Sequence, residues 1–326
     1  MPKPAALALS LVVAIAIAGR LSAQSAEPAL SDLATRLAAM TAVTGYEQSV
    51  MDSLVALLPG AVRDRAGNAV LVLGGGARRR LVACPVSEPG FVVGNVRDDG
   101  WLTLRRAPGR VPPAVERQLE GQRVDLFGRR GLVRGVVAVR SIHLTRGRGV
   151  PARSFTVDSA YVDIGAATRA DVSAAGVEVL TPLALAKDPQ RYGPDLLAAP
   201  VAARRTACAA LVLAARRAIA EQGMVPRGES VVVAFVVEQE LSGRGLATVA
   251  HMRGPFAETL LVDGGPGEPG GISRGADSLA RRWPALGPVT RWALGARYFG
   301  TPVETTSLAG AEGLLAELGR WIGGEP

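Results

Sequence analysis

The sequence predicts an α/β protein that carries an inserted all-β domain, and three observations lead to this fold class. Residues 30–58 place apolar side chains at helical spacing and lead into an apolar strand at 69–73. Residues 91–139 lack long helical patterns and instead alternate polar and apolar side chains between recurrent glycine turns. Beyond residue 160, helices and strands alternate again. A β segment between two α/β segments is typical of a β domain inserted into an α/β domain.

The first α/β segment covers residues 27–92 and is expected to open the sheet. Thr44-Gly45 divides its helical pattern into two pieces. Gly67-Asn68 predicts a turn before the strand at 69–73. Three consecutive glycines then precede a short apolar strand at 81–83.

The inserted domain is expected at residues 93–159 and has the pattern of a small β-barrel. Residues 122–127 and 132–137 alternate in polarity on either side of a glycine-rich turn, which predicts a hairpin. Residues 160–326 are expected to complete the α/β domain. The elements predicted there are helices at 202–222, 246–253 and 308–322 and strands at 161–165, 230–237 and 260–263.

The N-terminus has the pattern of a secretory signal peptide, which we place at residues 1–26. Lys3 supplies a positive charge, an apolar run of about 15 residues follows, and small residues at 21–26 offer a cleavage site. Because about 20 apolar residues are needed to span a bilayer, we expect cleavage and export to the periplasm or the exterior. We expect no membrane span after cleavage, and an uncleaved anchor is the alternative.

The composition is compatible with a large folded core and a basic surface. The chain has 326 residues, 48% of them hydrophobic, and a formal net charge of +8. No basic motif interleaved with aromatic residues occurs, so nucleic acid is not an expected partner. The charge indicates either a solvated basic surface or attraction to anionic envelope material.

Cysteine and histidine are scarce. Cys84 and Cys208 lie in apolar sequence and are either two small buried residues or, in an oxidising compartment, a disulfide. Of the two histidines, His143 falls in the predicted insert and His251 follows a predicted helix start. Because imidazoles are common ligands of zinc, so few histidines argue against a zinc or cobalt pair.

Seven short segments occur in an order that points to one family. They are residues 44–47 (TGYE), 64–68 (DRAGN), 88–91 (EPGF), 98–102 (DDGWL), 121–124 (GQRV), 161–166 (YVDIGA) and 298–304 (YFGTPVE). In this order they resemble the tetrahedral, glutamyl and deblocking aminopeptidases, cocatalytic metallopeptidases that include endoglucanase-M-like and FrvX-like proteins. The resemblance runs from about residue 30 to the end. It implies a doubly wound, three-layer α/β domain with an inserted β-barrel that helps the protein to oligomerise.

The resemblance also implies a site with two divalent metals, zinc or cobalt, that share a bridging carboxylate and hold a water molecule. A glutamate takes the proton from that water. Carried onto this chain, the general-base position is Gln239, which cannot accept a proton at neutral pH. A slip of one residue would make Glu238 the base, but Arg244-Gly245 supports the register that places Gln239 there.

Three metal-ligand positions of the family carry residues that cannot replace the original ligand. Pro85 stands at the first histidine, or Cys84 does if the match shifts by one residue. Ala203 stands at the bridging aspartate, and Gly300 at the last histidine. The resemblance therefore predicts a site that has lost most of its metal ligands.

Two ligand positions keep a carboxylate, at Glu240 and Asp263. These residues are either vestigial metal ligands or partners of nearby arginines, which would relieve the repulsion left by a lost dication. The candidate arginines are Arg204, Arg205 and Arg244. We also take Arg205 and Arg244 as candidate binding residues.

These observations favour an exported, aminopeptidase-like protein that has lost catalysis and acts by binding a peptide or an envelope glycan, or by assembly. We expect no resident cofactor, and we expect a homodimer formed through the β insert. One alternative is a weak or altered hydrolase with a single divalent metal on Glu240 and Asp263. The other is a structural module that binds anionic envelope material through its basic surface.

Overall fold

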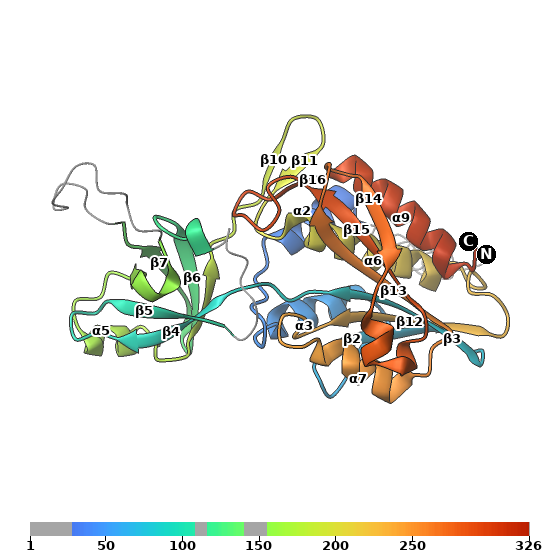
Figure 1. The fold of residues 1–326 in the computed structure, drawn as a ribbon, viewed down its shortest axis with the longest axis horizontal. Helices are drawn as coiled ribbons and strands as arrows, with labels where there is room; N and C mark the ends of the chain where they lie inside the picture. Colours follow the sequence, from blue (N-terminus) through green and yellow to red (C-terminus); the bar gives the residue numbers. More distant parts are fainter. Residues whose placement is uncertain (1–27, 108–115, 140–154, 326) are drawn as a thin grey trace, which may run out of the picture.

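The computed structural model describes residues 28–107, 116–139 and 155–325, which form an α/β body and a β-barrel (Figure 1). The predicted signal peptide and His143 lie outside the described residues. Among the helices of these three ranges, none is long and apolar enough to cross a membrane.

A seven-stranded sheet forms the middle layer of the α/β body. Its strands follow the order β1 (Val62–Arg63), β2 (Ala69–Gly74), β12 (Glu229–Val236), β3 (Arg78–Pro85), β13 (Glu258–Pro266), β15 (Val289–Ala296) and β14 (Ile272–Ala276). The inner strands β12, β3, β13 and β15 run parallel, whereas β1, β2 and β14 are antiparallel to their neighbours. Alternate residues of β12 enter the apolar cores on opposite faces, as a parallel strand covered on both sides requires.

Helices cover both faces of this sheet, which gives the predicted doubly wound, three-layer arrangement (Figure 1). The larger layer contains α2 (Leu30–Ala38), α3 (Gln48–Leu57), α6 (Ala202–Ala220) and α9 (Leu308–Ile322). The other face is covered by α7 (Arg244–Arg253), α8 (Leu279–Arg282) and the 3-10 turn η2 (Pro284–Leu286).

Helix α6 is the central helix of the larger layer, and its composition explains its position. Most of its buried residues are alanines, which let α2, α9 and the sheet approach the helix closely. Val201 immediately precedes the helix in the left-handed conformation, with a φ of 53°. The N-terminal end of α6 packs against the end of β13, where a Cβ at Gly264 would lie 2.6 Å from the Arg204 nitrogen.

The inserted domain is a closed six-stranded barrel. Its strands are β4 (Phe91–Val96), β5 (Leu102–Arg106), β8 (Tyr161–Asp163), β7 (Gly131–Val137), β6 (Arg123–Gly128) and β9 (Pro182–Leu185). The hairpin expected at 122–137 is present as the β6–β7 pair. Strands β8 and β9 lie beyond residue 159, where we ended the insert, with the short helix α5 (Arg169–Ala174) between them. The barrel needs both strands to close, because β8 joins β5 to β7 and β9 joins β4 to β6.

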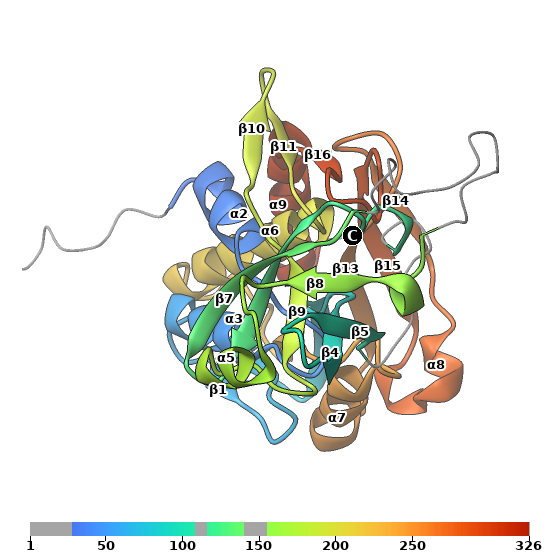
Figure 2. The same cartoon turned by 90° about the vertical axis from the view of Figure 1, so that its left-hand side faces the viewer.

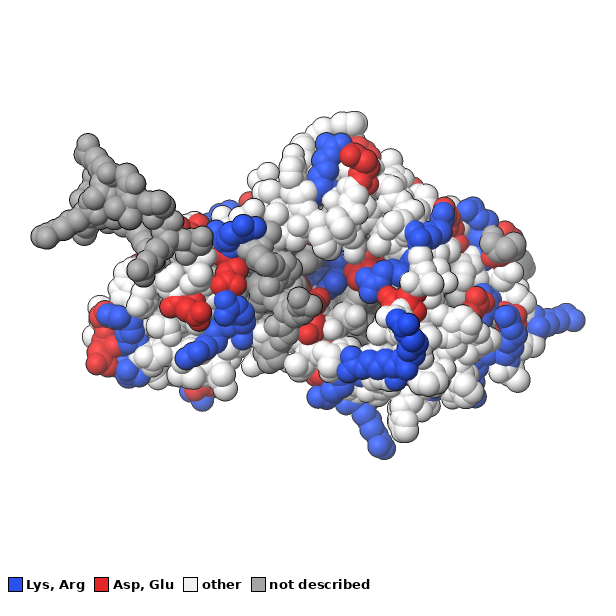
Figure 3. Space-filling view, in the orientation of Figure 1, with Lys and Arg blue, Asp and Glu red and all other residues white. Residues whose placement is uncertain are grey.

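A small three-stranded sheet pairs a hairpin that precedes α6 with a strand that precedes α9. It contains β10 (Gln190–Tyr192), β11 (Leu196–Ala198) and β16 (Thr305–Ser307). The β10–β11 hairpin projects from the body (Figure 2). Over the face drawn in Figure 3, basic and acidic side chains are interspersed rather than separated into large patches of one sign.

Candidate functional site

The ends of three parallel strands meet the N-terminal end of α6 at one edge of the sheet. Strands β3 and β12 end at Pro85 and Val236, and β13 carries Asp263 near its end. The segments 86–88 and 237–243 continue from the first two strands. Because open α/β sheets bind ligands outside the carboxyl ends of their strands, this edge is the candidate functional site.

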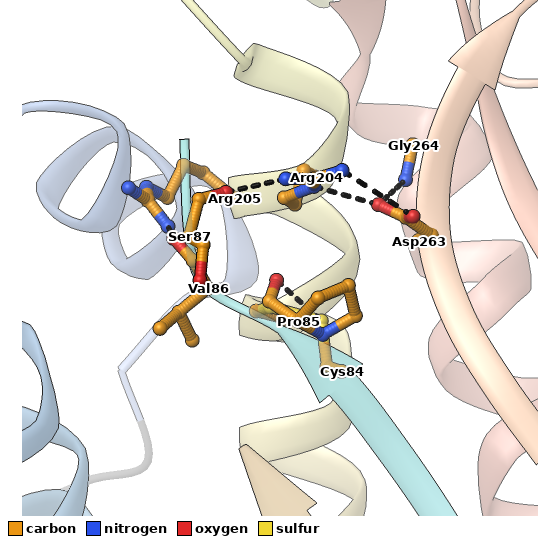
Figure 4. Close-up of a disulfide and its surroundings, with 9 residues drawn as sticks. Cys84, Pro85, Val86, Ser87, Arg204, Arg205, Asp263 and Gly264 are labelled. Atoms are coloured by element: carbon orange, nitrogen blue, oxygen red, sulfur yellow. Dashed lines mark hydrogen bonds and ion pairs between the residues drawn. A yellow bond between two sulfur atoms is a disulfide. The ribbon is translucent and has the colours of Figure 1, made fainter. Parts of the chain in front are cut away.

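Arg204, in the first turn of α6, lies between the two carboxylates that the resemblance marks as kept. Its Nε donates to Asp263 Oδ1 at 2.8 Å, and its Nη1 donates to Glu240 Oε1 at 2.9 Å. The Nη1 group also donates to the carbonyl oxygen of Ser87 (Figure 4). Burial alone would lower the pKa of Arg204, but the carboxylates of Asp263 and Glu240 raise this pKa above its usual value. Arg204 is therefore a permanent cation inside the cluster.

Asp263 is surrounded by donors. The residue is 3% exposed, and its Oδ1 also accepts a hydrogen bond from the Gly264 N–H at 2.8 Å. Its Oδ2 accepts a hydrogen bond from Arg291 Nη1 at 3.2 Å. A metal at this carboxylate would have to displace an arginine from it.

The predicted bridging position adds no ligand to this cluster. Ala203 is fully buried, and its methyl group lies close to Gly264, where an added Cβ would be 2.8 Å away. The Ala203 N–H donates to Glu304 Oε1 at 3.0 Å. The residue therefore contributes only packing and a backbone hydrogen bond.

The loop after β12 is held by side chains from other segments. Glu47 Oε1 accepts hydrogen bonds from the Ser87 hydroxyl at 2.7 Å and from the Glu238 N–H at 2.8 Å. The Ser87 oxygen accepts a hydrogen bond from the Gln239 N–H at 3.0 Å. This chain of contacts fixes the backbone at Gln239, the predicted general-base position.

Four non-glycine residues in segments bordering the site have a left-handed backbone. They are Val201, Glu238, Ser242 and Tyr298, with φ between 53° and 62°. Such conformations cost on the order of 1–3 kcal/mol each and persist only where the surroundings impose them. The site therefore keeps strained backbone of the kind that clusters at functional sites.

The remaining ligand positions have structural contacts. Cys84 forms a disulfide with Cys208, with a Cα–Cα distance of 5.7 Å, and this bond joins β3 to α6. The structure thus decides between the two interpretations of the cysteines. Pro85, the last residue of β3, lies beside this disulfide (Figure 4). The Gly300 N–H donates to Glu304 Oε2 at 2.9 Å.

The two predicted binding arginines have different environments. Arg205 is 1% exposed, and its guanidinium donates to the Val86 carbonyl and, at 3.1 Å, to Glu88 Oε2. Arg205 therefore stabilises the segment after β3 from within the protein. Because it is not accessible from solvent, the prediction that it contacts a ligand is wrong. The side chain of Arg244 is 61% exposed and lies 3.4 Å from Glu238 Oε2. Of the two, Arg244 alone is accessible at the surface.

A cavity of about 180 Å³ opens beside Arg204 and Glu240, between the α/β body and the barrel. Its apolar wall consists of Pro89, Phe91, Ala184, Leu185, Pro200, Val201 and Phe299. Sites for drug-sized ligands usually measure about 300–1,000 Å³. This cavity therefore has room for a small group and not for an extended chain.

Two buried groups beside the cavity were missed by the sequence analysis. The Lys187 ammonium donates to the Met40 carbonyl at 2.9 Å and to Glu88, and burial lowers the pKa of Lys187 to about 8. Burial also raises the pKa of Glu304. The sequence could have identified Glu304 as a site residue, because it ends the 298–304 motif. Lys187 lies in no motif that we identified.

The residues at this edge do not fit a dinuclear metal centre. Both kept carboxylates are bound to Arg204. The described part of the chain contains no group of three or more His, Cys, Asp or Glu side chains that could hold a metal. His251 is exposed on α7, and the site consists instead of carboxylates balanced by arginines.

A sequence model of the M42 glutamyl aminopeptidases matches residues 67–269 of this chain. The chain belongs to the M42 family. SgcX of Escherichia coli (strain K12), provisionally named an aminopeptidase, is 31% identical over 178 residues, which are 52% of this chain and 46% of SgcX. This chain spans about half the length of the curated relatives that it matches.

Solved structures of aminopeptidases share the fold over about 90% of this chain. Aminopeptidase APDkam598 from the archaeon Desulfurococcus kamchatkensis has a TM-score of 0.75 at 18% identity, covering 90% of this chain and 94% of that chain. The TET1 peptidase of Pyrococcus horikoshii has a TM-score of 0.76 at 17% identity, covering 90% and 99%. At these identities the structural comparison establishes the fold and leaves the chemistry to the residues of the site.

Proposed function

We propose that this M42-family protein has lost peptidase catalysis and acts by binding or assembly. The observation that carries the proposal is the Arg204 guanidinium, which lies between Asp263 and Glu240. Divalent metals would be repelled by this fixed charge and would have to take both carboxylates away from it. In addition, Gln239 at the general-base position has no proton acceptor for a water molecule at neutral pH.

The strained backbone around the site supports a binding role. Strain of this kind is stored where a ligand or a reaction needs a fixed geometry, and here it remains although the catalytic side chains are replaced. The cavity beside Arg204 is lined by apolar side chains, with Glu240 and Thr301 among its polar groups. A small apolar group of a peptide or of an envelope ligand suits this lining.

Metal content is the first test of this proposal. The chain would be purified without a histidine tag, incubated with zinc, cobalt and manganese, desalted and measured by inductively coupled plasma mass spectrometry. The lysyl aminopeptidase of Pyrococcus furiosus, a curated relative, would be processed in parallel for comparison. We expect less than about 0.1 metal per chain, and retention of one or two metals would contradict the proposal.

Peptidase activity is the second test, and it separates loss of catalysis from altered catalysis. We expect no hydrolysis of aminoacyl-p-nitroanilides above the rate without protein, with or without added metal. Metal-dependent hydrolysis that disappears in Glu240→Ala would instead favour the alternative of a single-metal hydrolase. Glu317→Ala serves as the matched control, because Glu317 is a similarly exposed acid on α9 that pairs with Arg274, outside the site.

We also propose export through residues 1–26 and self-association through the barrel. The TET1 peptidase of Pyrococcus horikoshii is described as assembling into a tetrahedron or a large octahedral shell, which supports self-association. Cell fractionation would test export, with chain found only in the cytoplasm as the contradicting result. N-terminal sequencing of the exported chain would test cleavage, with an intact Met1 as the contradicting result. Light scattering after size exclusion would test assembly, with a monomer at all concentrations as the contradicting result.

A basic envelope-binding module remains the competing function. It predicts adsorption to anionic envelope material that weakens as salt is added, because exposed charges are screened. Adsorption that is unchanged by salt, or absent, would remove this alternative.

A further inference from the structure

The barrel carries a second cleft, which is separate from the site at the edge of the sheet. Its volume is about 670 Å³, within the range of about 300–1,000 Å³ that is usual for ligand sites. Three aromatic side chains, Trp101, Phe155 and Tyr161, line it together with Arg97, Asp99 and Asp158. Aromatic residues make up only 4% of the chain, so three in one cleft is a local concentration.

The aromatic wall is fixed by the turn between β4 and β5. The backbone N–H of Arg97 donates a hydrogen bond to the backbone carbonyl of Trp101 at 2.8 Å, and this bond closes the turn. Gly100 has a φ of 82°, and an added Cβ would lie 2.3 Å from the Ala166 oxygen. The turn is thus held against the segment after β8, and Tyr161 is the first residue of β8. Trp101 and Tyr161 are consequently presented by a hydrogen-bonded turn and a strand.

The charged groups of the cleft are also ordered. Arg97 makes hydrogen bonds to both carboxylate oxygens of Asp99, at 3.0 and 2.8 Å, and its guanidinium lies over the Tyr161 ring at 5.3 Å from the centroid. The side chain of Asp158 is 71% exposed and lies 4.0 Å from Arg106. Arg106 is shared with Glu116, which it contacts more closely. Among the described residues, the cleft is therefore lined by one arginine and two carboxylates.

This chemistry selects among classes of ligand. A polyanion such as nucleic acid needs cations that outnumber the acids around it, and among the described residues that line the cleft two carboxylates accompany one arginine. A purely apolar ligand would take the largely exposed Asp158 carboxylate out of water without offering it a hydrogen bond. A sugar ring offers C–H faces to aromatic side chains and hydroxyl donors to carboxylates, whose charge-assisted hydrogen bonds are strong. The geometry points to a binding site on the barrel for a pyranose ring that carries no anionic group.

Titration calorimetry with the purified chain tests this site. The probes are an N-acetylglucosamine tetramer and a glucose tetramer, with heparin as the anionic comparator. We expect one of the uncharged tetramers to bind and Trp101→Ala to weaken it by at least about tenfold, in keeping with a lost aromatic contact. Phe127→Ala is the matched control, because Phe127 is another exposed aromatic side chain of the same barrel, on β6, outside the cleft.

Further variants protect the test against misfolding. Trp101→Phe keeps an aromatic ring and should retain more affinity than Trp101→Ala, and thermal melting would verify that both variants fold. The proposal is overturned if neither uncharged tetramer binds up to about 10 mM. It is also overturned if Trp101→Ala binds as well as Phe127→Ala, or if heparin binds in a manner that depends on Trp101.

Discussion

Replacing Arg204 by methionine should destabilise the protein strongly, because it removes the cation shared by two poorly exposed carboxylates. Asp263 and Glu240 have side chains that are 4% and 22% exposed, and Arg204 itself is 14% exposed. Removing one partner of a buried ion pair typically costs about 3–5 kcal/mol, because the other charge remains without its partner. Arg291 still contacts Asp263 at 3.2 Å, so we expect a value within this range rather than above it. For a chain of this size the melting temperature should fall by about 5–8 °C.

The assay is thermal and urea unfolding of wild type, Arg204→Met and the control Arg244→Met, followed by circular dichroism at pH 7. Arg244 is an exposed arginine that lies 3.4 Å from Glu238, so its loss should cost no more than about 1 kcal/mol. Added manganese or calcium should raise the melting temperature of Arg204→Met and not that of wild type. In the variant, Glu240, the Ser87 carbonyl and the Asp263 Oδ1 atom are released from Arg204 for a hard cation that prefers oxygen ligands.

Two results would refute the reasoning. If Arg204→Met unfolded like Arg244→Met, Arg204 would not be the charge on which the cluster depends. If divalent cations stabilised wild type as much as the variant, the guanidinium would not exclude a metal. The second result would also remove the main support for lost catalysis.

Three further predictions follow from the same structure. Burial lowers the pKa of Lys187 to about 8 from 10.5. Between these pH values the unfolded chain binds more protons than the folded chain, so the free energy of unfolding should rise with pH. Urea unfolding at pH 8 and 10 should show this rise in wild type and not in Lys187→Met. Removing the disulfide in a Cys84→Ala/Cys208→Ala double variant should lower the free energy of unfolding by up to about 5 kcal/mol, since the bond closes a loop across a separation of 124 residues. An unchanged urea midpoint would contradict this prediction. Ser242→Gly should raise the free energy of unfolding by up to about 1 kcal/mol, because glycine adopts the φ of 62° without strain. The gain is limited because glycine loses more conformational entropy on folding. A loss of stability in urea would show that the Ser242 side chain has a structural role.

Sequence patterns predicted several long buried elements of the α/β body, because such elements have strong periodicity, but they did not predict the strands β14 and β15. The helix expected at 202–222 is α6, and the strand expected at 230–237 is β12. The end of the insert was harder to predict. Strand β8 has three residues and β9 has four, and neither is long enough to show the alternation that identifies a strand. Their place in the barrel depends on pairing with strands far away in the sequence.

The site was predicted as a set of positions and not as a set of contacts. Sequence reasoning named Arg204 as one of three arginines that could pair with Glu240 and Asp263, and the structure shows that this one contacts both. Arg204 and Arg205 are adjacent in the chain, yet on a helix they point about 100° apart. One therefore faces the carboxylates, and the other faces Glu88 beneath the strand ends. The spacing of two adjacent arginines could not decide which of them entered the cluster.

The Arg204 cluster also explains how a site can keep its geometry without metals. A metal pair joins the strand ends and the helix that supply its ligands, and the loss of that cross-link would leave like charges facing one another. Here Arg204 joins α6 to β13, to the loop after β12 and to the Ser87 carbonyl after β3. The Cys84–Cys208 disulfide joins α6 to β3 a turn further along the helix. These links connect the elements around the strained residues, so the backbone at Val201 and Glu238 can remain strained. A protein that needed only its fold would gain stability by relaxing these residues, and this is why we expect the edge of the sheet to have a ligand.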